Sequence, residues 1–471
     1  MQTQTQSSTN PSQVSQSTYS LPDILRQRRQ KLADRVDFPV VLWSGMSPSR
    51  NFPANVYPFR ASSHFLYFAG LPLQNAAIRI DGSSLELYMD NPSPGDALWH
   101  GHTETRDDIA EQIGADAAFP MSALPSRADG AATLAVQNSQ THLHQSQVLG
   151  RSLSPAVDPQ GIDAQLADAI IELRLIHDDG AIAELRKAAR VSVKAHKAGM
   201  AATPTAKTEA DVRAAMEHVI IANGMSCAYT SIVSVHGEVL HNETYYHRLQ
   251  SGDLLLADVG AEAESGWASD ITRTWCVSGT FSPTQRAIYE IVLAAHDACI
   301  DQVCPGIEYR DLHLLAARVI ADGLVDLGIL RGNPDDLIDM DAHALFFPHG
   351  VGHLIGLDVH DMEDLGDRAG YASGRSRSDR FGLCYLRLDR PIKAGMAVTI
   401  EPGFYQVPAI LNDPKRRSRY ATAVNWEQLA DFSDVRGIRI EDDVLVTESG
   451  CEVLTADLPT QVTAIEQLVR G

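Results

Sequence analysis

The sequence predicts an α+β protein in two parts, and three observations carry this prediction. Up to about residue 165, strand-like runs alternate with helical stretches, which is typical of an α/β domain. Beyond that point, paired strand runs and longer helical patterns indicate an antiparallel sheet with helices packed on one side. The 471 residues exceed one ordinary core, since a domain usually holds about 100–200 residues. We therefore expect a tail over 1–20, a smaller α/β domain over 21–165 and a larger domain over 166–471.

The N-terminal part begins with a polar segment rich in Gln, Ser and Thr, which lacks the features of a signal or transit peptide and is expected to be disordered. A short basic helix is expected over Leu21–Arg35 and a second helix over Thr105–Ile113. Ser126–Asp163, which is rich in Ser, Gln and Pro, is expected to form irregular loops. The expected strands are Pro39–Trp43, Phe65–Phe68, Ala77–Ile80 and Leu85–Tyr88.

The C-terminal part opens with a helical pattern over Ile171–Met200, which the sequence Asp-Asp-Gly at 178–180 interrupts. Helices are also expected over Ala210–Asn223, where Asn-Gly ends the pattern, and over Phe281–Val303, where Ser-Pro begins it. A fourth helix is expected over Tyr309–Leu327. The expected strands are Ser231–Val235, Leu254–Ala261, Trp267–Val277, Ala397–Phe404 and Val435–Thr447.

The composition excludes several classes of protein. A net charge of −21 argues against nucleic acid or an anionic membrane as a partner, because both attract basic surfaces. No apolar run reaches the roughly 18 residues that a membrane-spanning helix needs. The six cysteines include no C-x-x-C pair and none precedes Cys227, which favours reduced thiols in a cytoplasmic protein.

Two aspartates flank a predicted turn at Glu264-Ser265-Gly266. If the hairpin is centred on residue 264, Asp258 and Asp270 face each other directly, at the roughly 4.5–5.5 Å where like charges destabilise a sheet. Burial among apolar neighbours would strengthen the repulsion, and a shared cation would relieve it. The alternative is that one of the two aspartates faces solvent.

Three histidines, His349, His353 and His360, lie close together and are interspersed with glycines. The glycines argue against a helix and allow the backbone to approach a site closely. A single histidine in an apolar segment is usually structural, but three in so short a stretch favour a functional site.

Two glutamates complete the candidate set. Glu401 ends the apolar run Ala397–Ile400 before a Pro-Gly turn, and Glu441 follows Arg439 on the same face of an alternating strand. Taken singly, they also fit a surface glutamate and a simple Arg–Glu ion pair. Together with the two aspartates and a histidine they offer mostly oxygen ligands, which suit Mn²⁺, with Co²⁺ or Zn²⁺ as alternatives. Four carboxylates can neutralise two dications, and two such ions can activate a shared water for hydrolysis.

These segments resemble those of the pita-bread metallopeptidases, which include methionine aminopeptidases, Xaa-Pro aminopeptidases (aminopeptidase P) and Xaa-Pro dipeptidases (prolidases). The resemblance extends from about residue 21 to the C-terminal end and is greatest for the proline-specific members. In the N-terminal part it rests on Tyr57–Arg60, Phe65–Gly70 and Trp99–Gly101. In the C-terminal part the motifs are LLLADVGAE, ASDITRTW, HGVGHLIGLDVHD, TIEPGFY and GIRIEDD.

The resemblance implies a pita-bread catalytic domain over 166–471, an aminopeptidase P-type N-terminal domain, and two Mn²⁺-like ions. It implies that Asp270 and Glu441 bridge both ions, that His353 and Glu401 complete one site, and that Asp258 completes the other.

The same resemblance implies the catalytic roles. Glu401 would be the general base that accepts a proton from the attacking water, and His360 would hydrogen-bond the scissile carbonyl or the intermediate. His241 would line the pocket beside His349 and shape it for proline, and Arg439 would hold the surrounding network or a substrate carboxylate.

The chain departs from the group in two places. Asp258 and Asp270 are one position further apart than in many members, which the turn can accommodate. The segment Asp367–Asp389 is long and rich in Arg, Gly and Ser. We expect it to cap the site and limit substrate length, so that deleting Tyr371–Arg380 should broaden the accepted lengths.

The expected activity is therefore that of an Xaa-Pro aminopeptidase, a metallo-exopeptidase acting on peptides with proline second. An Xaa-Pro dipeptidase is the nearest alternative. A non-catalytic peptide-binding relative and a metal-free hydrolase like creatinase are disfavoured, because all five ligand positions are present. The family also implies a homodimer or homotetramer.

Overall fold

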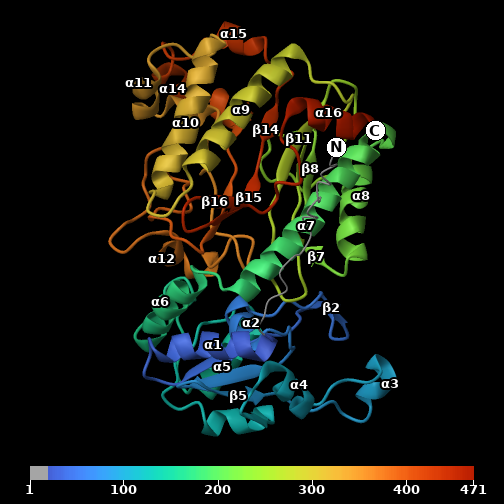
Figure 1. Cartoon of the computed structure of the whole chain (residues 1–471), viewed down its shortest axis with the longest axis vertical. Coiled ribbons are helices and arrows are strands. Elements are labelled where there is room, and N and C mark those ends of the chain that lie inside the picture. The colour runs from blue at the N-terminus through green and yellow to red at the C-terminus, as the bar shows by residue number, and fades with distance from the viewer. Residues whose placement is uncertain (1–19) are drawn as a thin grey trace, which may run out of the picture.

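The computed structural model describes residues 20–471, so the tail predicted over 1–20 lies outside the described residues except for Ser20. The predicted boundary at residue 165 stays a prediction, and helix α6 (Ile162–Arg174) runs across it. In Figure 1 the N-terminal part lies below the larger C-terminal part, with α6 near the junction, and α7 (Asp179–Ala202) runs from the junction up along the C-terminal part. No helix within residues 20–471 combines the length and apolar character that a membrane span requires.

The N-terminal part is built on a four-stranded sheet in the order β1-β4-β5-β6, antiparallel except for the β5–β6 pair. Its strands are β1 (Val40–Trp43), β4 (Ala77–Asp81), β5 (Ser84–Tyr88) and β6 (Ala117–Phe119), with a separate hairpin of β2 (Ser49–Phe52) and β3 (Asn55–Val56). Its helices are α1 (Leu21–Ala33), α2 (Ser63–Ala69), α3 (Asp96–His100), α4 (Arg106–Ile113), η1 (Met121–Ser126) and α5 (Ser139–Val148).

Two expectations for this part are wrong. Phe65–Phe68 is not a strand but lies in α2, all of whose residues are buried and which ends at Gly70 in the left-handed region. A short run that is apolar on every side has no period that distinguishes helix from strand. The segment expected to be loops contains α5, which Asn138 caps by accepting from Thr141 N. Its polar composition concealed it, because it has little apolar face.

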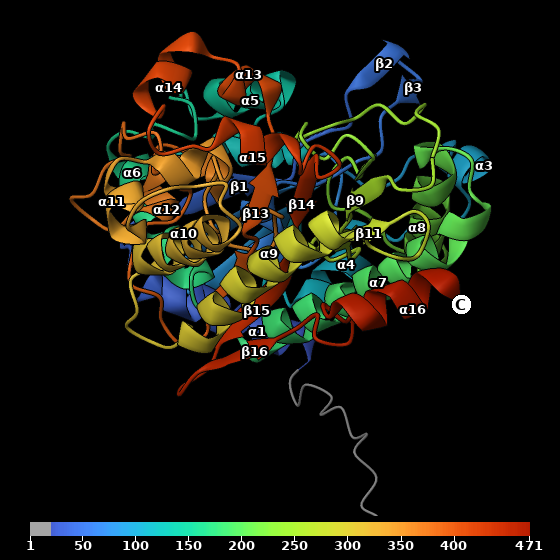
Figure 2. The same ribbon diagram turned by 90° about the horizontal axis from the view of Figure 1, so that it is seen from above.

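The C-terminal part places helices on the flanks of short antiparallel strands. Figure 1 shows α9 and α10 on one flank of the strands and α7 and α8 on the other, and Figure 2 shows the same helices from above. The helices beyond α7 are η2 (Thr203–Thr205), α8 (Glu209–Ala222), α9 (Pro283–Gln302), α10 (Tyr309–Asp326), α11 (Pro334–Asp339), η3 (Ala342–Leu345), η4 (Glu363–Leu365), α12 (Asp367–Gly370), α13 (Pro408–Leu411), α14 (Pro414–Arg419), α15 (Trp426–Ala430) and α16 (Val462–Arg470).

The strands pair in three small antiparallel sets that carry the site, in the orders β11-β9-β8, β12-β15-β16 and β13-β14. A bridge between Thr272 and Glu441 joins the first set to the strand β15 region. The strands of this part are β7 (Ser226–Cys227), β8 (Ile232–Ser234), β9 (Leu254–Asp258), β10 (Ala261–Glu262), β11 (Thr272–Cys276), β12 (Ala397–Ile400), β13 (Gly403–Tyr405), β14 (Gly437–Arg439), β15 (Asp442–Val446) and β16 (Cys451–Val453).

The hairpin register corrects one expectation. Asp258 pairs with Thr272, so the predicted direct opposition of Asp258 and Asp270 is wrong. The turn is centred on Ser265, one residue later than expected, because Ala263 N donates to Trp267 O at 2.9 Å. A shift of one residue in the centre of the turn moves the partner of Asp258 by two positions, from Asp270 to Thr272. Side chains two positions apart lie on the same face of a strand, so the two aspartates still share a face and are diagonal neighbours.

Polar contacts of the buried side chains His64 and Arg174 join the N-terminal part and α6 to the segment between Asp358 and Asp364, which carries one of the three histidines. Arg174, at the end of α6, donates to Asp361 Oδ1 at 2.6 Å and to Asp358 Oδ2 at 3.2 Å. Its other terminal nitrogen contacts His64 Nδ1 at 3.0 Å, and His64 Nε2 lies 2.9 Å from Asp364 Oδ2. The first part of the chain therefore holds a segment of the site in place.

Candidate metal centre and peptide site

The structure brings all five expected ligand side chains together from separate segments. Asp258 ends β9, Asp270 precedes β11, His353 lies in the glycine-rich loop, Glu401 follows β12 and Glu441 precedes β15. Three groups of three lie with their ligand atoms within 4.8 Å of one another, and two of them consist of expected ligands alone: Asp258, Asp270 and Glu441, and His353, Glu401 and Glu441. Glu441 belongs to both groups, which is the geometry that two neighbouring cations would need.

The cluster is electrostatically unfavourable without cations. Burial and the nearby charge of Asp258 hold the pKa of Asp270 well above its usual range, and burial and Asp270 do the same for Glu441. Burial raises the pKa of Glu401 to about 7, although Arg439 opposes the shift. Among the described residues, the buried Oε1 of Glu441 has no hydrogen-bond partner, whereas its Oε2 accepts from Thr272 Oγ1 at 2.6 Å. An orphaned carboxylate oxygen among three other carboxylates fits a divalent cation.

His353 is oriented as a ligand. Its Nδ1 lies 3.0 Å from the backbone oxygen of Leu354, so Nδ1 carries the proton and the lone pair of Nε2 is free. Nε2 lies 3.5 Å from Asp270 Oδ2 and 3.8 Å from Glu401 Oε1. Burial and His360 hold its pKa well below the usual range, so the ring is neutral. A Cβ on Gly352 would meet the oxygen of Thr399 at 2.2 Å, which explains the glycine beside the ligand.

Tyr229 and Arg439 hydrogen-bond the carboxylates of the two aspartates. The hydroxyl of Tyr229 lies within hydrogen-bond distance of Asp258 Oδ1 and 2.5 Å from Asp270 Oδ1, and its single proton is shared between these two acceptors. Arg439 donates to Asp258 Oδ2 at 2.5 Å, to Thr272 Oγ1 at 2.9 Å and to the hydroxyl of Tyr405 at 3.0 Å. The guanidinium of Arg439 thus belongs to the network behind the carboxylates.

The cluster lies at a cavity of about 590 Å³. His349 is held by Tyr405, whose hydroxyl lies 2.8 Å from Nε2, and burial with Arg439 lowers its pKa to about 3. Beyond the five candidate ligands, the cavity is lined by Leu240, His241, Pro348, His349, Gly350, His360, Arg377, Tyr385, Arg387, Val407, Ile410 and Arg439. The three histidines expected to contact substrate therefore share this wall.

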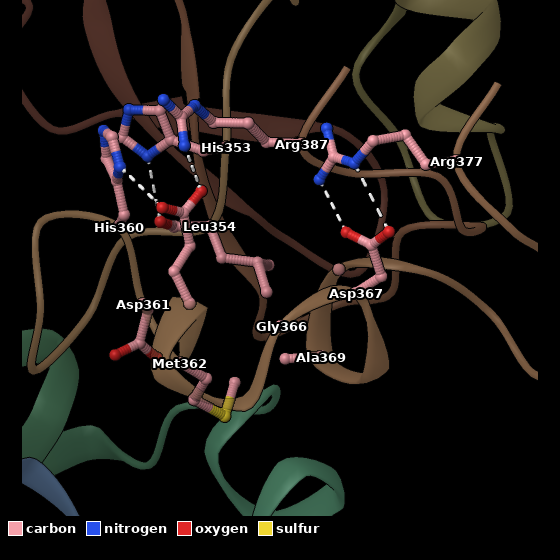
Figure 3. A pocket seen from close by; sticks show the side chains of 12 residues that line it. His353, Leu354, His360, Asp361, Met362, Gly366, Asp367, Ala369, Arg377 and Arg387 are labelled. Atoms are coloured by element: carbon pink, nitrogen blue, oxygen red, sulfur yellow. Dashed lines mark hydrogen bonds and ion pairs between the residues drawn. The ribbon is translucent and has the colours of Figure 1, made fainter. Parts of the chain in front are cut away.

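His360 also borders a smaller cavity of about 170 Å³. Figure 3 shows His353, His360 and Arg387 together on one side of it and Arg377 beside Asp367 on the other. His360 Nδ1 lies 3.0 Å from Glu363 Oε2, and Arg387 donates to Glu363 Oε1 at 2.5 Å. Although burial alone would raise it, the pKa of Glu363 falls to about 2 because His360 and Arg387 both hydrogen-bond its carboxylate.

The long arginine-rich segment reaches the site as expected. Arg377, Tyr385 and Arg387 line the main cavity. The segment is anchored by Asp389, which is fully buried and accepts from Arg310 and, at 2.9 Å, from Arg375. It therefore forms a fixed wall of the cavity.

Several site residues were not predicted. Nothing in the sequence around Tyr229 signalled its contact with two aspartates, because a tyrosine before a strand is common. Tyr405 ends the motif that begins at Thr399, and the alternation of that strand could have placed it on the site's face. Arg387 lies in the segment singled out for length but was not itself singled out.

Residues 183–448 match the profile of metallopeptidase family M24, and residues 25–138 match the aminopeptidase P N-terminal domain. The chain belongs to metallopeptidase family M24. A probable Xaa-Pro aminopeptidase of Tuber melanosporum is 32% identical to this M24 peptidase over 84% of each chain, and one of Verticillium alfalfae is 33% identical over 84% of this chain and 85% of the relative.

Solved structures agree with that assignment. The aminopeptidase PepP of Pseudomonas aeruginosa is 30% identical, with a TM-score of 0.76 over 95% of this chain and 98% of its own. Aminopeptidase P from E. coli with the inhibitor Pro-Leu is 26% identical, with the same TM-score and coverage. This M24 peptidase is thus a metallo-exopeptidase with the pita-bread fold, as the sequence predicted, and the family implies divalent metal ions.

Proposed function

We propose that this M24 peptidase hydrolyses the bond between an N-terminal residue and a following proline, as an Xaa-Pro aminopeptidase acting on peptides. The curated relatives carry that activity in their names and align with most of both chains. The observation that carries the proposal is the convergence of four carboxylates and one neutral imidazole beside a cavity large enough for a short peptide.

We infer that the cluster binds two divalent ions, with Asp270 and Glu441 shared between them. Asp258 would complete one site, and His353 with Glu401 the other. The unpartnered Oε1 of Glu441 and the raised pKa values of Asp270 and Glu441 support this assignment. The oxygen-rich set favours Mn²⁺, with Co²⁺ or Zn²⁺ as alternatives.

Bound ions would lower the pKa of a water and stabilise negative charge on the scissile carbonyl. Glu401 suits the role of general base, because its carboxylate lies in the candidate ligand group and in the cavity wall, within reach of a water at that centre. Its Oε2 lies 4.0 Å from Arg439 Nε, which keeps part of its charge stabilised.

His360 is placed to hydrogen-bond the substrate's scissile carbonyl, and His241 is placed to contact its proline. Glu363 holds Nδ1 of His360, and a ring nitrogen of His360 lies within 4.8 Å of the ligand atoms of Asp270 and His353. That position suits a donor to the developing oxyanion. His241 and His349 share the cavity wall with apolar side chains that could pack against a proline ring.

An Xaa-Pro dipeptidase remains the second candidate, because arginines reach the same cavity and could bind a dipeptide's carboxylate. The names of the relatives favour the aminopeptidase. We also propose a cytoplasmic enzyme that forms a homodimer or homotetramer. Its cysteines, all of which lie among the described residues, are unpaired, which fits a reducing compartment.

The test combines metal analysis of the purified protein with hydrolysis of Xaa-Pro and Xaa-Pro-Yaa peptides. We expect two ions per chain and cleavage of the tripeptides. Asp270→Ala and Glu441→Ala should each lose at least one tightly bound ion together with activity. Preference for Xaa-Pro alone would favour the dipeptidase, and full metal content in both variants would contradict the ligand assignment.

A further inference from the structure

Glu209, the first residue of α8, is fully buried although it carries a carboxylate. Its Oε1 accepts from Val235 N at 2.8 Å and from Ser234 Oγ at 3.1 Å. Its Oε2 accepts from His247 Nδ1 at 2.8 Å and from His247 N at 3.3 Å. One side chain therefore binds both ends of the loop that leaves β8 at Val235 and returns at His247.

The tip of this loop enters the catalytic cavity. Leu240 and His241 line the cavity wall, and the neighbouring Asn242 is buried. Asn242 Nδ2 donates to Ser234 Oγ at 2.7 Å, and Ser234 in turn donates to Glu209. A continuous chain of hydrogen bonds therefore joins Glu209 to the residue next to His241.

The start of α8 reinforces this attachment. The first backbone N–H groups of a helix have no partner within the helix. Here Glu209 N donates to His247 O at 3.2 Å, and Ala210 N donates to Tyr245 O at 3.1 Å. On the other side of the loop, a Cβ on Gly237 would meet the oxygen of Gly437 at 2.8 Å, so the loop base also packs directly on β14.

Only a carboxylate suits the position of Glu209. The four groups around it, on Val235, Ser234 and His247, are all donors. A carboxylate only accepts, whereas an amide would turn an NH₂ group toward one pair of donors. Leaving such buried donors unsatisfied is costly, so the loop would shift.

We propose that Glu209 is a positioning residue for the peptidase reaction, holding the Val235–His247 loop so that His241 stands correctly in the cavity. This proposal rests on the proposed function, because it requires that His241 contacts the peptide substrate. Glu209 contacts neither the candidate metal ligands nor the cavity, so its effect on catalysis must pass through the loop.

The test compares Glu209→Gln with Asp211→Asn. Asp211 is a matched control, since it lies in the same first turn of α8, but its carboxylate accepts from Lys207 N and Thr208 N, which precede the helix, and not from the loop. We expect Glu209→Gln to lower kcat/KM on an Xaa-Pro-Yaa peptide by about tenfold or more, since small displacements of catalytic groups cost that much. Asp211→Asn should stay within about twofold, and both variants should keep full metal content.

A double-mutant cycle with His241→Ala separates positioning from general damage. If Glu209 acts through His241, adding Glu209→Gln to His241→Ala should cost less than about twofold, because the positioned group is already absent. Full additivity, or metal loss in Glu209→Gln, would overturn the proposal. If Glu209→Gln does not fold, His247→Ala, which removes one donor and leaves the carboxylate, should give a smaller loss with the same non-additivity.

Hydrogen–deuterium exchange gives a readout that does not depend on activity. Exchange should rise in the Val235–His247 loop of Glu209→Gln and stay unchanged in Asp211→Asn. An inactive but metal-loaded wild type would refute the proposed function, yet faster loop exchange would still show the Glu209 attachment. Normal wild-type activity with unchanged loop exchange in Glu209→Gln would refute the positioning role alone.

Discussion

At the scale of single residues, the candidate centre depends on groups that hold ligands as much as on the ligands. Asp258 has both oxygens occupied, by Tyr229 and by Arg439. His353 is held through Nδ1 by a backbone oxygen. Such contacts reduce the number of orientations that each ligand side chain can adopt, so less conformational entropy is lost when a metal binds.

Tyr229→Phe should therefore weaken metal binding by about tenfold, as the loss of a contact behind a metal ligand usually does. The variant removes only the hydroxyl that joins Asp258 and Asp270. Titration with Mn²⁺ followed by calorimetry measures the change. Tyr245→Phe is the control, because that hydroxyl donates to the backbone oxygen of Ser231 instead. Equal affinities in the two variants would contradict the role of Tyr229.

His360→Ala should retain both ions and lose turnover by about 100-fold or more, since removing an oxyanion donor costs about that much. The same variant tests the alternative that His360 is a metal ligand, because a ring nitrogen of His360 lies close to the ligand atoms of Asp270 and His353. Loss of one ion in this variant would make His360 a ligand, and full activity would remove it from the reaction. Glu363→Gln, which keeps the ring but removes its anionic partner, should lose less activity.

At the scale of elements, sequence patterns predicted most helices and strands, and the failures have physical causes. Long helices such as α7 and α9 carry both periodic apolar residues and capping side chains, so their limits were predicted closely. Helix α2 failed because burial on all sides removes the period. The hairpin register failed because it depends on the turn's conformation, which the sequence Glu-Ser-Gly does not specify.

The four candidate carboxylates were predictable because each lies at or near the end of a strand, and such positions can gather at one edge of a folded sheet, whereas His353 was predictable from its glycine-rich loop. What brings them together is pairing between distant segments. The bridge of Thr272 to Glu441 is one example, and no local pattern encodes it. Tyr229 was missed for the same reason.

The arginine-rich segment should limit substrate length through its buried anchor. Asp389→Asn removes the charge that holds Arg310 and Arg375, so the wall should loosen. Because Arg310 and Arg375 are each partly exposed, the loss of stability should be smaller than the roughly 3–5 kcal/mol of a fully buried pair, and the accepted peptides should become longer. A length series of Xaa-Pro peptides and thermal unfolding measure both effects. Arg368→Ala, which breaks only a pair with Asp168 at 2.6 Å near the surface, should change neither. Unchanged length preference in Asp389→Asn would contradict the role of the segment.

At the scale of the whole molecule, folding must bring four carboxylates together in a buried cluster. In the metal-free protein, burial raises the pKa of Glu401 from about 4.5 in the unfolded chain to about 7. The folded state then binds more protons than the unfolded state between these values, so this contribution to stability falls as the pH rises through the window. Bound cations remove the penalty, because they compensate the charge.

Chelation should therefore lower Tm, and by more at pH 7 than at pH 5, with a loss of about 5 °C or more at neutral pH. Differential scanning calorimetry with and without EDTA measures the difference. Asp270→Asn should raise the Tm of the metal-free protein, because it removes one of the repelling charges. A metal-free Tm that increases from pH 5 to pH 7 would contradict the linkage.

The ion pairs centred on Arg174 connect the candidate site to residues that lie outside the M24 match. A gene fragment encoding only the half that matches the M24 profile would retain every candidate ligand, yet it would lack His64 and the α6 residue that restrains the histidine segment. In such a fragment Asp361 would lose the guanidinium that binds it, and the segment that carries His360 would be less restrained.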